Sequence, residues 1–312
     1  MTRCHFCYEP VKDGDTYHAK CCRNFFGTSS QPILHLDKQI LDDLAARTVN
    51  KRIAVTGVQP KLSVDIQSEN GYKRLTLVGL WGKYILKPQH EKFRFMPETE
   101  DLTMHLANVF KIKTCEHALV KTSDGTMAYI ARRFDRNNGG KIHVEDFCQI
   151  SGFLTEQKYK GSYEKIGKLI MQYCSNRGLD TLNFFELVLF SFLTGNNDMH
   201  LKNFSVIHHD DRSVSLAPAY DLLNVNLIFP EDREELALTL NGRKRKITKE
   251  DFDVLAEKLN LPQKAARNIY VKFLKGRDKV ENLISASFLP DEWKIDYLKI
   301  WDEKIKILSG VE

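Results

Sequence analysis

A short polar segment at residues 195–204, with the sequence GNNDMHLKNF, contains side chains that could transfer a phosphoryl group. Asp198 and Asn203 stand five residues apart, and Asp221 follows eighteen residues after Asn203. Phosphoryl transfer from ATP needs one carboxylate to accept the proton of the attacking hydroxyl, while an amide oxygen and a second carboxylate hold Mg²⁺ against the phosphates. Asp198, Asn203 and Asp221 could supply these groups. The segment also fits an ordinary polar turn, because Asn and Asp favour turns.

The elements expected around this segment are those that a protein-kinase catalytic loop needs, and the spacing Asp-x4-Asn is that of such a loop. Residues 184–193 are apolar nearly all round, which predicts a buried central helix with no chemical role. Short strands are predicted at 205–207 and 213–216, so that Asp221 comes just after a hairpin. His200 is a candidate for stabilising charge on the transferred phosphoryl group.

The region before the polar segment predicts a small sheet with one helix. Alternation and a hairpin signal place the expected strands at 61–66, 74–78, 83–87, 116–121 and 127–134. The helix is expected at about 98–110, and a further helical pattern runs from Ile33 to Leu44. From about residue 145 the pattern turns helical, and past Thr248 it is helical throughout.

Two features of this sheet-forming region could bind phosphate. Lys87 stands at the end of a short strand, where a lysine can point at phosphates, although most lysines are simply exposed. The segment TGVQPK precedes the first clear strand and could offer backbone N–H groups to phosphate oxygens, or it could be an ordinary turn. Glu98 or Glu100, at the start of the helix, could pair with Lys87 or simply complement the helix dipole.

Eight segments of the chain resemble the HipA-like serine/threonine kinases, which are toxins of bacterial toxin–antitoxin systems. The segments are GVQPKLSV, YILKP, PETEDLTMHLA, ARRFDR, HVEDFCQISGF, KYKGSYEKI, GNNDMHLKNFSV and LAPAYDLL. They cover about residues 50–260, and GN-x-D-x-H-x-x-N with the later YDL is the most specific. The resemblance implies an α+β, bilobal protein-kinase-like fold with a small sheet-rich N-lobe and a larger helical C-lobe. The chain is expected to divide into a Cys/His-rich segment (residues 1–30), the N-lobe (residues 31–136) and the C-lobe (residues 137–312).

The resemblance also implies roles for individual residues. Asp198 would be the catalytic base, and Asn203 and Asp221 would bind Mg²⁺. Arg132 to Phe134 would form the hinge that cradles adenine. The nucleotide would lie between the lobes, and the residues expected to contact ATP are Thr56, Gly57, Val58, Gln59, Pro60, Lys61, Lys87, Arg132, Arg133, Phe134, His200, Tyr220 and Asp221.

The implied substrate of this ATP- and Mg²⁺-dependent kinase is an aminoacyl-tRNA synthetase, whose phosphorylation inhibits translation. The implied partners are a HipB-like DNA-binding antitoxin and a separate small HipS-like subunit, with DNA reached only through the antitoxin. The chain resembles the compact form of the family. About 50 residues precede the segment TGVQPK, which would be the Gly-rich loop, and they leave no room for the whole N-terminal subdomain of long HipA proteins. Compact members often carry Ser-x-Ser before the loop glycine, where this chain has Ala54 and Thr56. We hypothesise that Thr56 becomes the autophosphorylated residue.

Two other classes of function stay open at this point. One is a phosphotransferase acting on a small molecule such as an antibiotic. The other is a catalytically silent module that holds an antitoxin–DNA complex, although the full set of Lys87, Asp198, Asn203 and Asp221 argues against it.

The N-terminus carries a cluster of metal-binding residue types, Cys4-x2-Cys7-x10-His18-x2-Cys21. Two pairs of soft ligands at this spacing could close a tetrahedral Zn²⁺ site, with Cys22 as a spare ligand. The alternative is a set of reduced thiols and a surface histidine. An odd total of seven cysteines does not suggest a secreted disulfide framework.

Composition and charge narrow the class of protein. The chain has 312 residues, 42% of them hydrophobic and 28% charged, which is ordinary for a globular protein of about two domains. A net charge of +5 is too small to predict nucleic-acid binding. The basic run GRKRK at 242–246 is expected to be a solvated loop, or else a contact for DNA, tRNA or an acidic partner. No stretch reaches the length of a membrane span, and we expect a cytoplasmic protein.

Overall fold

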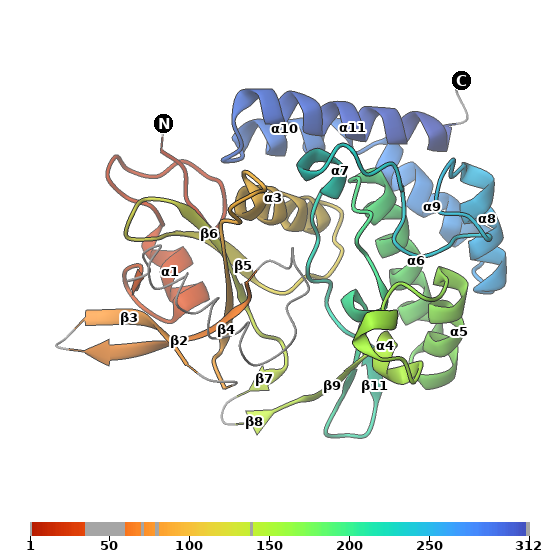
Figure 1. The fold of residues 1–312 in the computed structure, drawn as a ribbon, viewed down its shortest axis with the longest axis horizontal. Helices are drawn as coiled ribbons and strands as arrows, with labels where there is room; N and C mark the ends of the chain where they lie inside the picture. Colours follow the sequence, from red (N-terminus) through yellow and green to blue (C-terminus); the bar gives the residue numbers. More distant parts are fainter. Residues whose placement is uncertain (1, 35–59, 70–71, 79–80, 138–139, 310–312) are drawn as a thin grey trace. The chain divides into compact units, whose positions relative to one another are not determined.

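The computed structural model describes residues 2–34, 60–69, 72–78, 81–137 and 140–309 (Figure 1). Thr56 to Gln59, Ala54 and most of the helical pattern after Ile33 therefore lie outside the described residues. The chain divides into two compact units, which we describe separately. Unit 1 comprises residues 1–101, 115–133 and 286–288, and unit 2 comprises residues 102–114, 134–285 and 289–312.

Unit 1 is built on a six-stranded sheet whose strand order is β1-β3-β2-β4-β6-β5. The strands are β1 (Ile33–Leu34), β2 (Leu62–Glu69), β3 (Tyr72–Leu77), β4 (Tyr84–Pro88), β5 (His117–Lys121) and β6 (Met127–Arg132). Neighbouring strands are antiparallel except β1, which pairs in parallel with β3. The expected strands of this region are confirmed. The helix expected from Ile33 is wrong at its start, because the backbone of Ile33 and Leu34 pairs with β3 instead.

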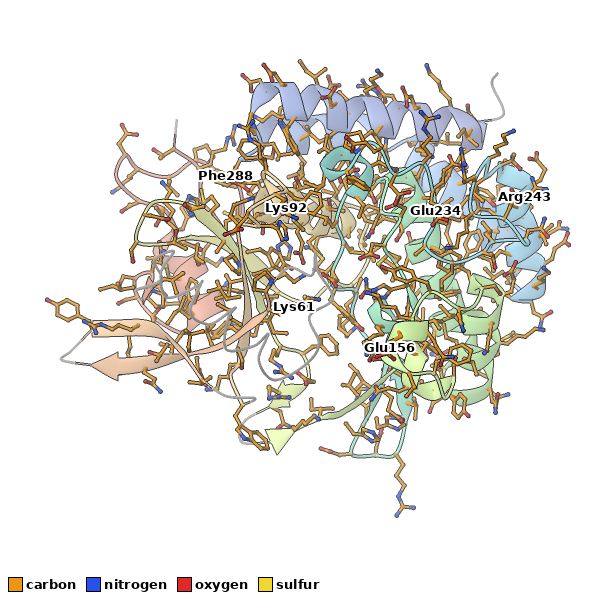
Figure 2. All side chains as sticks on the ribbon, viewed as in Figure 1. Lys61, Lys92, Glu156, Glu234, Arg243 and Phe288 are labelled. Atoms are coloured by element: carbon orange, nitrogen blue, oxygen red, sulfur yellow. The ribbon has the colours of Figure 1, made fainter. Side chains whose placement is uncertain are left out.

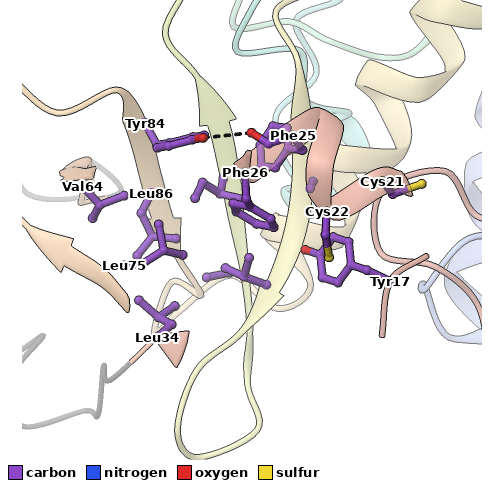
Figure 3. Packing of buried hydrophobic residues seen from close by; sticks show 14 of the residues in the cluster. Tyr17, Cys21, Cys22, Phe25, Phe26, Leu34, Val64, Leu75, Tyr84 and Leu86 are labelled. Atoms are coloured by element: carbon purple, nitrogen blue, oxygen red, sulfur yellow. Dashed lines mark hydrogen bonds between the residues drawn. The ribbon is translucent and has the colours of Figure 1, made fainter. Parts of the chain in front are cut away.

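The Cys-rich N-terminus completes the hydrophobic core of unit 1. Helix α1 (Ala19–Phe26) is amphipathic and places Phe25 and Phe26 against the sheet. Figure 3 shows these rings facing Tyr84 and Leu86 of β4. The Tyr84 hydroxyl donates a hydrogen bond to the Phe25 carbonyl over 2.8 Å. The N-terminal segment is therefore tied to the strand that ends in Lys87 and Pro88.

Unit 2 is mainly helical. Its helices are α3 (Met96–Val109, which begins in unit 1), α4 (Phe147–Ile150), α5 (Tyr163–Tyr173), α6 (Arg177–Leu193), α7 (Val225–Ile228), α8 (Lys249–Lys258), α9 (Gln263–Leu274), α10 (Arg277–Ala286) and α11 (Asp291–Ser309). Short 3₁₀ turns occupy Thr155–Gln157 and Leu201–Asn203. No helix of the described residues has both the length and the apolar character that crossing a membrane requires.

Two small sheets accompany these helices. One has the order β11-β10-β9, with β9 (His143–Asp146), β10 (Ser205–His208) and β11 (Val214–Leu216). The other pairs β7 (Arg136–Asn137) with β8 (Gly140–Lys141). The hairpin expected after the polar segment is confirmed as β10 and β11. Strand β9 falls where the sequence pattern predicted the start of helix, and it extends that hairpin by pairing with β10.

Helix α6 is the apolar centre of unit 2 and confirms the buried helix expected there. Its residues from Phe184 to Leu193 are buried without interruption. The helix ends at Leu193, and two residues later Gly195 adopts φ +64°, a conformation that favours glycine. A Cβ atom at this position would also lie 2.8 Å from Oδ1 of Asn224. The chain can therefore turn sharply out of α6 and into the polar loop.

We predict that Phe25→Ala lowers the free energy of unfolding by about 3–5 kcal/mol, because it empties a fully buried position in the core of unit 1. Urea unfolding measures the change. The control is Tyr72→Ala in β3, whose side chain is 63% exposed and whose loss should cost no more than about 0.5 kcal/mol. Equal losses in the two variants would show that the N-terminal segment is not part of this core.

Candidate functional site

The polar loop after α6 is buried, and its own amides satisfy its backbone. Asn196 is 1% exposed, and its side-chain oxygen accepts the backbone N–H of Asp198 over 3.3 Å. Asn197 is 5% exposed and donates through Nδ2 to the Glu234 carbonyl at 2.9 Å. Each of these bonds offsets a desolvation cost of roughly 1–3 kcal/mol, whereas Nδ2 of Asn196 and Oδ1 of Asn197 have no hydrogen-bond partner among the described residues. The loop is thus fixed from both sides at Asp198.

Asn203 closes the loop from its far end. The amide Nδ2 of Asn203 donates to the backbone carbonyl of Asp198 over 2.9 Å. Because this bond engages the nitrogen, Oδ1 is the atom that Asn203 can offer to a cation. The neighbouring Lys202 forms an ion pair with Asp146 at 2.8 Å, which ties the loop to the end of β9.

Asp221 follows β11 in a backbone conformation that the chain must hold in place. Its φ is +60°, a left-handed conformation that Asp tolerates better than most residues but that is uncommon outside glycine. The preceding Tyr220 donates its hydroxyl to the carbonyl of Lys202 at 2.8 Å and lies 2.5 Å from the hydroxyl of Ser205. These contacts connect the segment of Asp221 to the loop of Asn203. The ring of Phe134 packs against Tyr220 at 5.6 Å.

The charges of Asp198 and Asp221 both act on His200 and on Tyr159. Burial is the main cause that lowers the pKa of His200 to about 4, and the charges of Asp198 and Asp221 oppose this. The imidazole is therefore neutral near pH 7. Its Nδ1 is buried without a hydrogen-bond partner among the described residues. A neutral His200 can offer a hydrogen bond to a phosphoryl oxygen, but not a full positive charge.

Tyr159 is a site residue that the sequence did not single out. Its hydroxyl donates to Oδ1 of Asp198 over 2.6 Å, and its ring meets that of His200 edge to face at 5.1 Å. Burial, and then the charge of Asp198, raises the pKa of Tyr159 well above its ordinary value, so the hydroxyl stays protonated. The segment KYKGSYEKI held the residue, but nothing in its spacing indicated a partner 39 residues away.

In unit 1, Lys87 is buried and paired. Its ammonium group lies 2.5 Å from Oε1 of Glu100, and the two side chains are 6% and 2% exposed. It also stands 5.4 Å from the centre of the Tyr129 ring. The structure thus selects Glu100 over Glu98 as the partner of Lys87. A lysine held by a helix glutamate is an arrangement that kinases use to place a charge on phosphates.

Glu98 is a buried acid whose role is different. It is 8% exposed, and its Oε2 has no hydrogen-bond partner among the described residues. Burial raises the pKa of Glu98 to about 7, and the charge of Asp101 adds to the effect. The side chain is therefore close to half-protonated at neutral pH.

We predict that the stability of the wild-type chain falls as the pH rises from about 4.5 to about 7, because a raised pKa favours the protonated folded state below that window. Glu98→Gln should remove this decline, worth on the order of 3 kcal/mol or less, when unfolding is measured across the window. The control is Glu257→Gln, at an exposed position of α8. Parallel stability curves for Glu98→Gln and the wild type would contradict the prediction.

The residues expected to form the adenine hinge have structural contacts of their own. The guanidinium of Arg132 pairs with Glu116 at 2.6 Å and donates to the carbonyl of Asn24 at 2.6 Å. The backbone N–H of Arg133 donates to the Lys83 carbonyl over 2.9 Å. Arg132 therefore secures the N-terminal segment to β6. Pro60 and Lys61 stand at the start of β2, where Lys61 is exposed (Figure 2).

The four predicted ligands at the N-terminus are brought together in unit 1. One ligand atom each from Cys4, Cys7, His18 and Cys21 lies within 4.8 Å of the others. Cys22 is not among them, and its side chain is 2% exposed in the hydrophobic core. Burial raises the pKa of the Cys4 thiol, but backbone hydrogen bonds from His18, Phe6 and Cys7 outweigh it and leave the pKa lowered.

The basic run at 242–246 is partly neutralised by nearby acids. Arg243 lies 3.8 Å from Asp251, and Lys244 lies 3.3 Å from Glu234. The side chains of Arg243 and Glu234 project from the segment before α8 (Figure 2). Arg245 and Lys246 are exposed and line a cavity of about 620 Å³ together with acidic residues. These contacts agree with a solvated loop, and a DNA or tRNA contact stays a hypothesis.

Comparisons with known proteins show the family of the chain. The family model described as HipA-like C-terminal domain matches residues 53–279, and the chain belongs to this family. A protein of Haemophilus influenzae named "Putative kinase" is 28% identical over 289 residues, which cover 82% of each chain. The serine/threonine-protein kinase toxin HipA of Shewanella oneidensis is 28% identical over 212 residues, covering 61% of this chain and 47% of that protein.

Solved structures show the same fold. The HipA chain in the complex of Shewanella oneidensis HipA, HipB and operator DNA matches 96% of this chain and 81% of its own length, with a TM-score of 0.69 and 20% identity. The Helicobacter pylori proinflammatory kinase CtkA matches 80% of this chain and 94% of its own length, with a TM-score of 0.55 and 15% identity. The chain therefore has a mixed α+β fold of the type found in these kinases.

Proposed function

We propose that the chain is an ATP-dependent serine/threonine protein kinase of the HipA type. The observation that carries the proposal is the closed loop in which the Asn203 amide holds the Asp198 carbonyl. That bond leaves a carboxylate and an amide oxygen with the chemistry of a base and a metal ligand. We further propose that unit 1 is the N-lobe and unit 2 the C-lobe of the kinase fold.

The residues that would hold Mg²⁺ are Asn203, through Oδ1, and Asp221, through its carboxylate. Two oxygen donors from the protein fit the preference of this ion, which keeps several ligands from water and phosphate. When bound, the ion would offset the negative charge of the phosphates. Lys87, positioned by Glu100, would place a second positive charge on the nucleotide. The segment from Thr56 to Lys61 would cover the phosphates.

The chemistry assigned to the chain itself is proton transfer and orientation. A serine or threonine hydroxyl attacks the γ-phosphate in line, and Asp198 accepts the proton of that hydroxyl. Tyr159 already donates to Oδ1 of Asp198, which fixes the carboxylate and leaves Oδ2 for the substrate. Neutral His200 would donate a hydrogen bond to a phosphoryl oxygen.

We propose the biological role of the chain from its family. We propose that the substrate is an aminoacyl-tRNA synthetase, that a HipB-like protein is the antitoxin, and that a HipS-like subunit accompanies it. A HipB-like partner is supported by the fold shared with the HipA chain of the HipA, HipB and operator DNA complex. Autophosphorylation of Thr56 would add nearly two negative charges beside the ATP phosphates and so oppose their binding.

We predict that Asp198→Asn lowers phosphoryl transfer by about 10²–10⁴-fold, because it removes the general base while it preserves the shape of the side chain. The full chain is incubated with γ-labelled ATP and a bacterial lysate, and the labelled proteins are then separated. ATP binding, which a thermal-shift assay measures, should be unchanged by the substitution. The control is Asp210→Asn, which makes the same charge change at an exposed position between β10 and β11.

The same experiment separates the other functions. Undiminished protein labelling by Asp198→Asn rejects the assignment of the base. Label that enters a small metabolite in place of a protein favours a small-molecule phosphotransferase. A wild-type chain that does not bind Mg-ATP favours a silent antitoxin-binding module.

A further inference from the structure

The proposed kinase chemistry makes no use of the Cys/His cluster of unit 1, whose geometry is that of a metal site. Nδ1 of His18 lies 3.4 Å from the Cys7 sulfur and 3.7 Å from the Cys21 sulfur, and the two sulfurs are 3.8 Å apart. Tetrahedral Zn²⁺, with Zn–S of about 2.3 Å and Zn–N of about 2.1 Å, places its sulfurs ~3.8 Å apart and a sulfur and nitrogen ~3.6 Å apart. The three separations match these values. Cys4 contributes the fourth ligand atom within 4.8 Å.

The hydrogen bonding of His18 fits the same role. Its Nε2 lies 2.9 Å from the backbone carbonyl of Pro10, which can only accept. In the neutral ring, the proton is therefore on Nε2, and Nδ1 presents its lone pair to the sulfurs of Cys7 and Cys21. Metal-binding histidines are commonly oriented by a carbonyl in this way.

The backbone holds the four ligands in two preformed pairs. Cys4 and Cys7 belong to a tight turn in which the N–H of Tyr8 donates to the Cys4 carbonyl over 3.0 Å. Tyr8 adopts φ +63° there, a costly conformation for an aromatic residue that its surroundings must enforce. His18 is the N-cap of α1, and Cys21 stands three residues later on the same face.

We propose that Cys4, Cys7, His18 and Cys21 bind a structural Zn²⁺ ion. Three sulfurs and one imidazole nitrogen are a common zinc set, and four protein ligands leave no open position for a substrate. The thiols are free rather than joined as disulfides. Residues 2–18 contain no helix or multi-residue strand, so the ion would add to the hydrophobic contacts of Cys4 and Tyr17 in holding this segment.

Tyr8, which is adjacent to Cys7 of the proposed zinc site, contacts α3, the helix whose Glu100 pairs with Lys87. The hydroxyl of Tyr8 donates to Oδ2 of Asp101 over 2.7 Å, and Oδ1 of Asp101 lies 2.7 Å from Nδ1 of His117. Asp101 directly follows Glu100 in α3. Zinc would therefore hold the turn that anchors the start of α3. This consequence rests on the proposed function, whereas zinc binding itself does not.

We test the site by the metal content of the full chain, purified under reducing conditions without a metal-affinity step. The expected result is about one Zn²⁺ per chain. Cys21→Ser should lower zinc retention by more than about tenfold. The matched control is Cys22→Ser, the next residue of α1, whose side chain lies in the core, and it should retain the metal.

A second measurement keeps the test independent of how the variants fold. The wild-type chain is depleted of zinc and titrated with Co²⁺, and the expected result is thiolate-to-cobalt charge-transfer absorption that zinc displaces. A wild-type chain with neither zinc nor this absorption overturns the proposal, as does equal metal loss from Cys21→Ser and Cys22→Ser. A chain that binds zinc but transfers no phosphoryl group leaves the site in place and rejects the kinase function instead.

Discussion

The hydrogen bond from the Asn203 amide to the Asp198 carbonyl is the contact on which the candidate site depends. The loop between these residues is polar, yet it is packed at the end of the most apolar helix of unit 2. Hydrogen bonds offset part of the cost of this burial: the side chain of Asn196 accepts the Asp198 N–H, and that of Asn197 donates to the Glu234 carbonyl. The same bonds therefore fix the backbone of Asp198 and orient the side-chain amide of Asn203.

The neighbouring elements extend this rigidity to the rest of the site. The hydroxyl of Tyr220 donates a hydrogen bond to the carbonyl of Lys202. This bond ties the strained backbone of the adjacent Asp221 to the loop of Asn203. Tyr159 fixes the Asp198 side chain, and burial keeps His200 neutral. A strained backbone persists only where the surrounding structure holds it in place, and such strain is concentrated at functional sites. We interpret the strain and the buried polar groups around Asp198 as preorganisation for charge that develops during transfer.

The sequence predicted the parts of this site that local pattern controls. The spacing of Asp198 and Asn203, the apolar helix before them and the hairpin after them are all local signals, and each element was found. Strand β9 was missed because it exists through pairing with β10, about 60 residues later in the chain. For the same reason, Ile33 was assigned to a helix although it pairs with β3.

Side-chain partners were harder to predict than elements. Glu98 and Glu100 both begin α3, and only the fold decides that Glu100 meets Lys87. Tyr159 has no local signal, because its partner comes from a distant part of the sequence. The Cys/His spacing did predict which four residues would meet, since two short local turns bring each pair together. Pattern thus indicates candidates, whereas nonlocal packing selects among them.

In unit 1 the Cys/His cluster is connected to the buried ion pair of Lys87 and Glu100. The turn at Tyr8 contacts Asp101, and the adjacent Glu100 holds Lys87 on β4. Helix α1 packs against that same strand through Phe25 and Tyr84. The N-terminal segment therefore supports both the lysine and its glutamate partner.

We propose that Asn203 and Asp221 hold a metal ion beside Asp198, which acts as the base. A crystal structure of the chain with Mg²⁺ and a non-hydrolysable ATP analogue tests it most directly. We expect a metal ion coordinated by Oδ1 of Asn203 and by a carboxylate oxygen of Asp221, with the γ-phosphate beside Asp198. A nucleotide or metal ion bound without these two residues would contradict it.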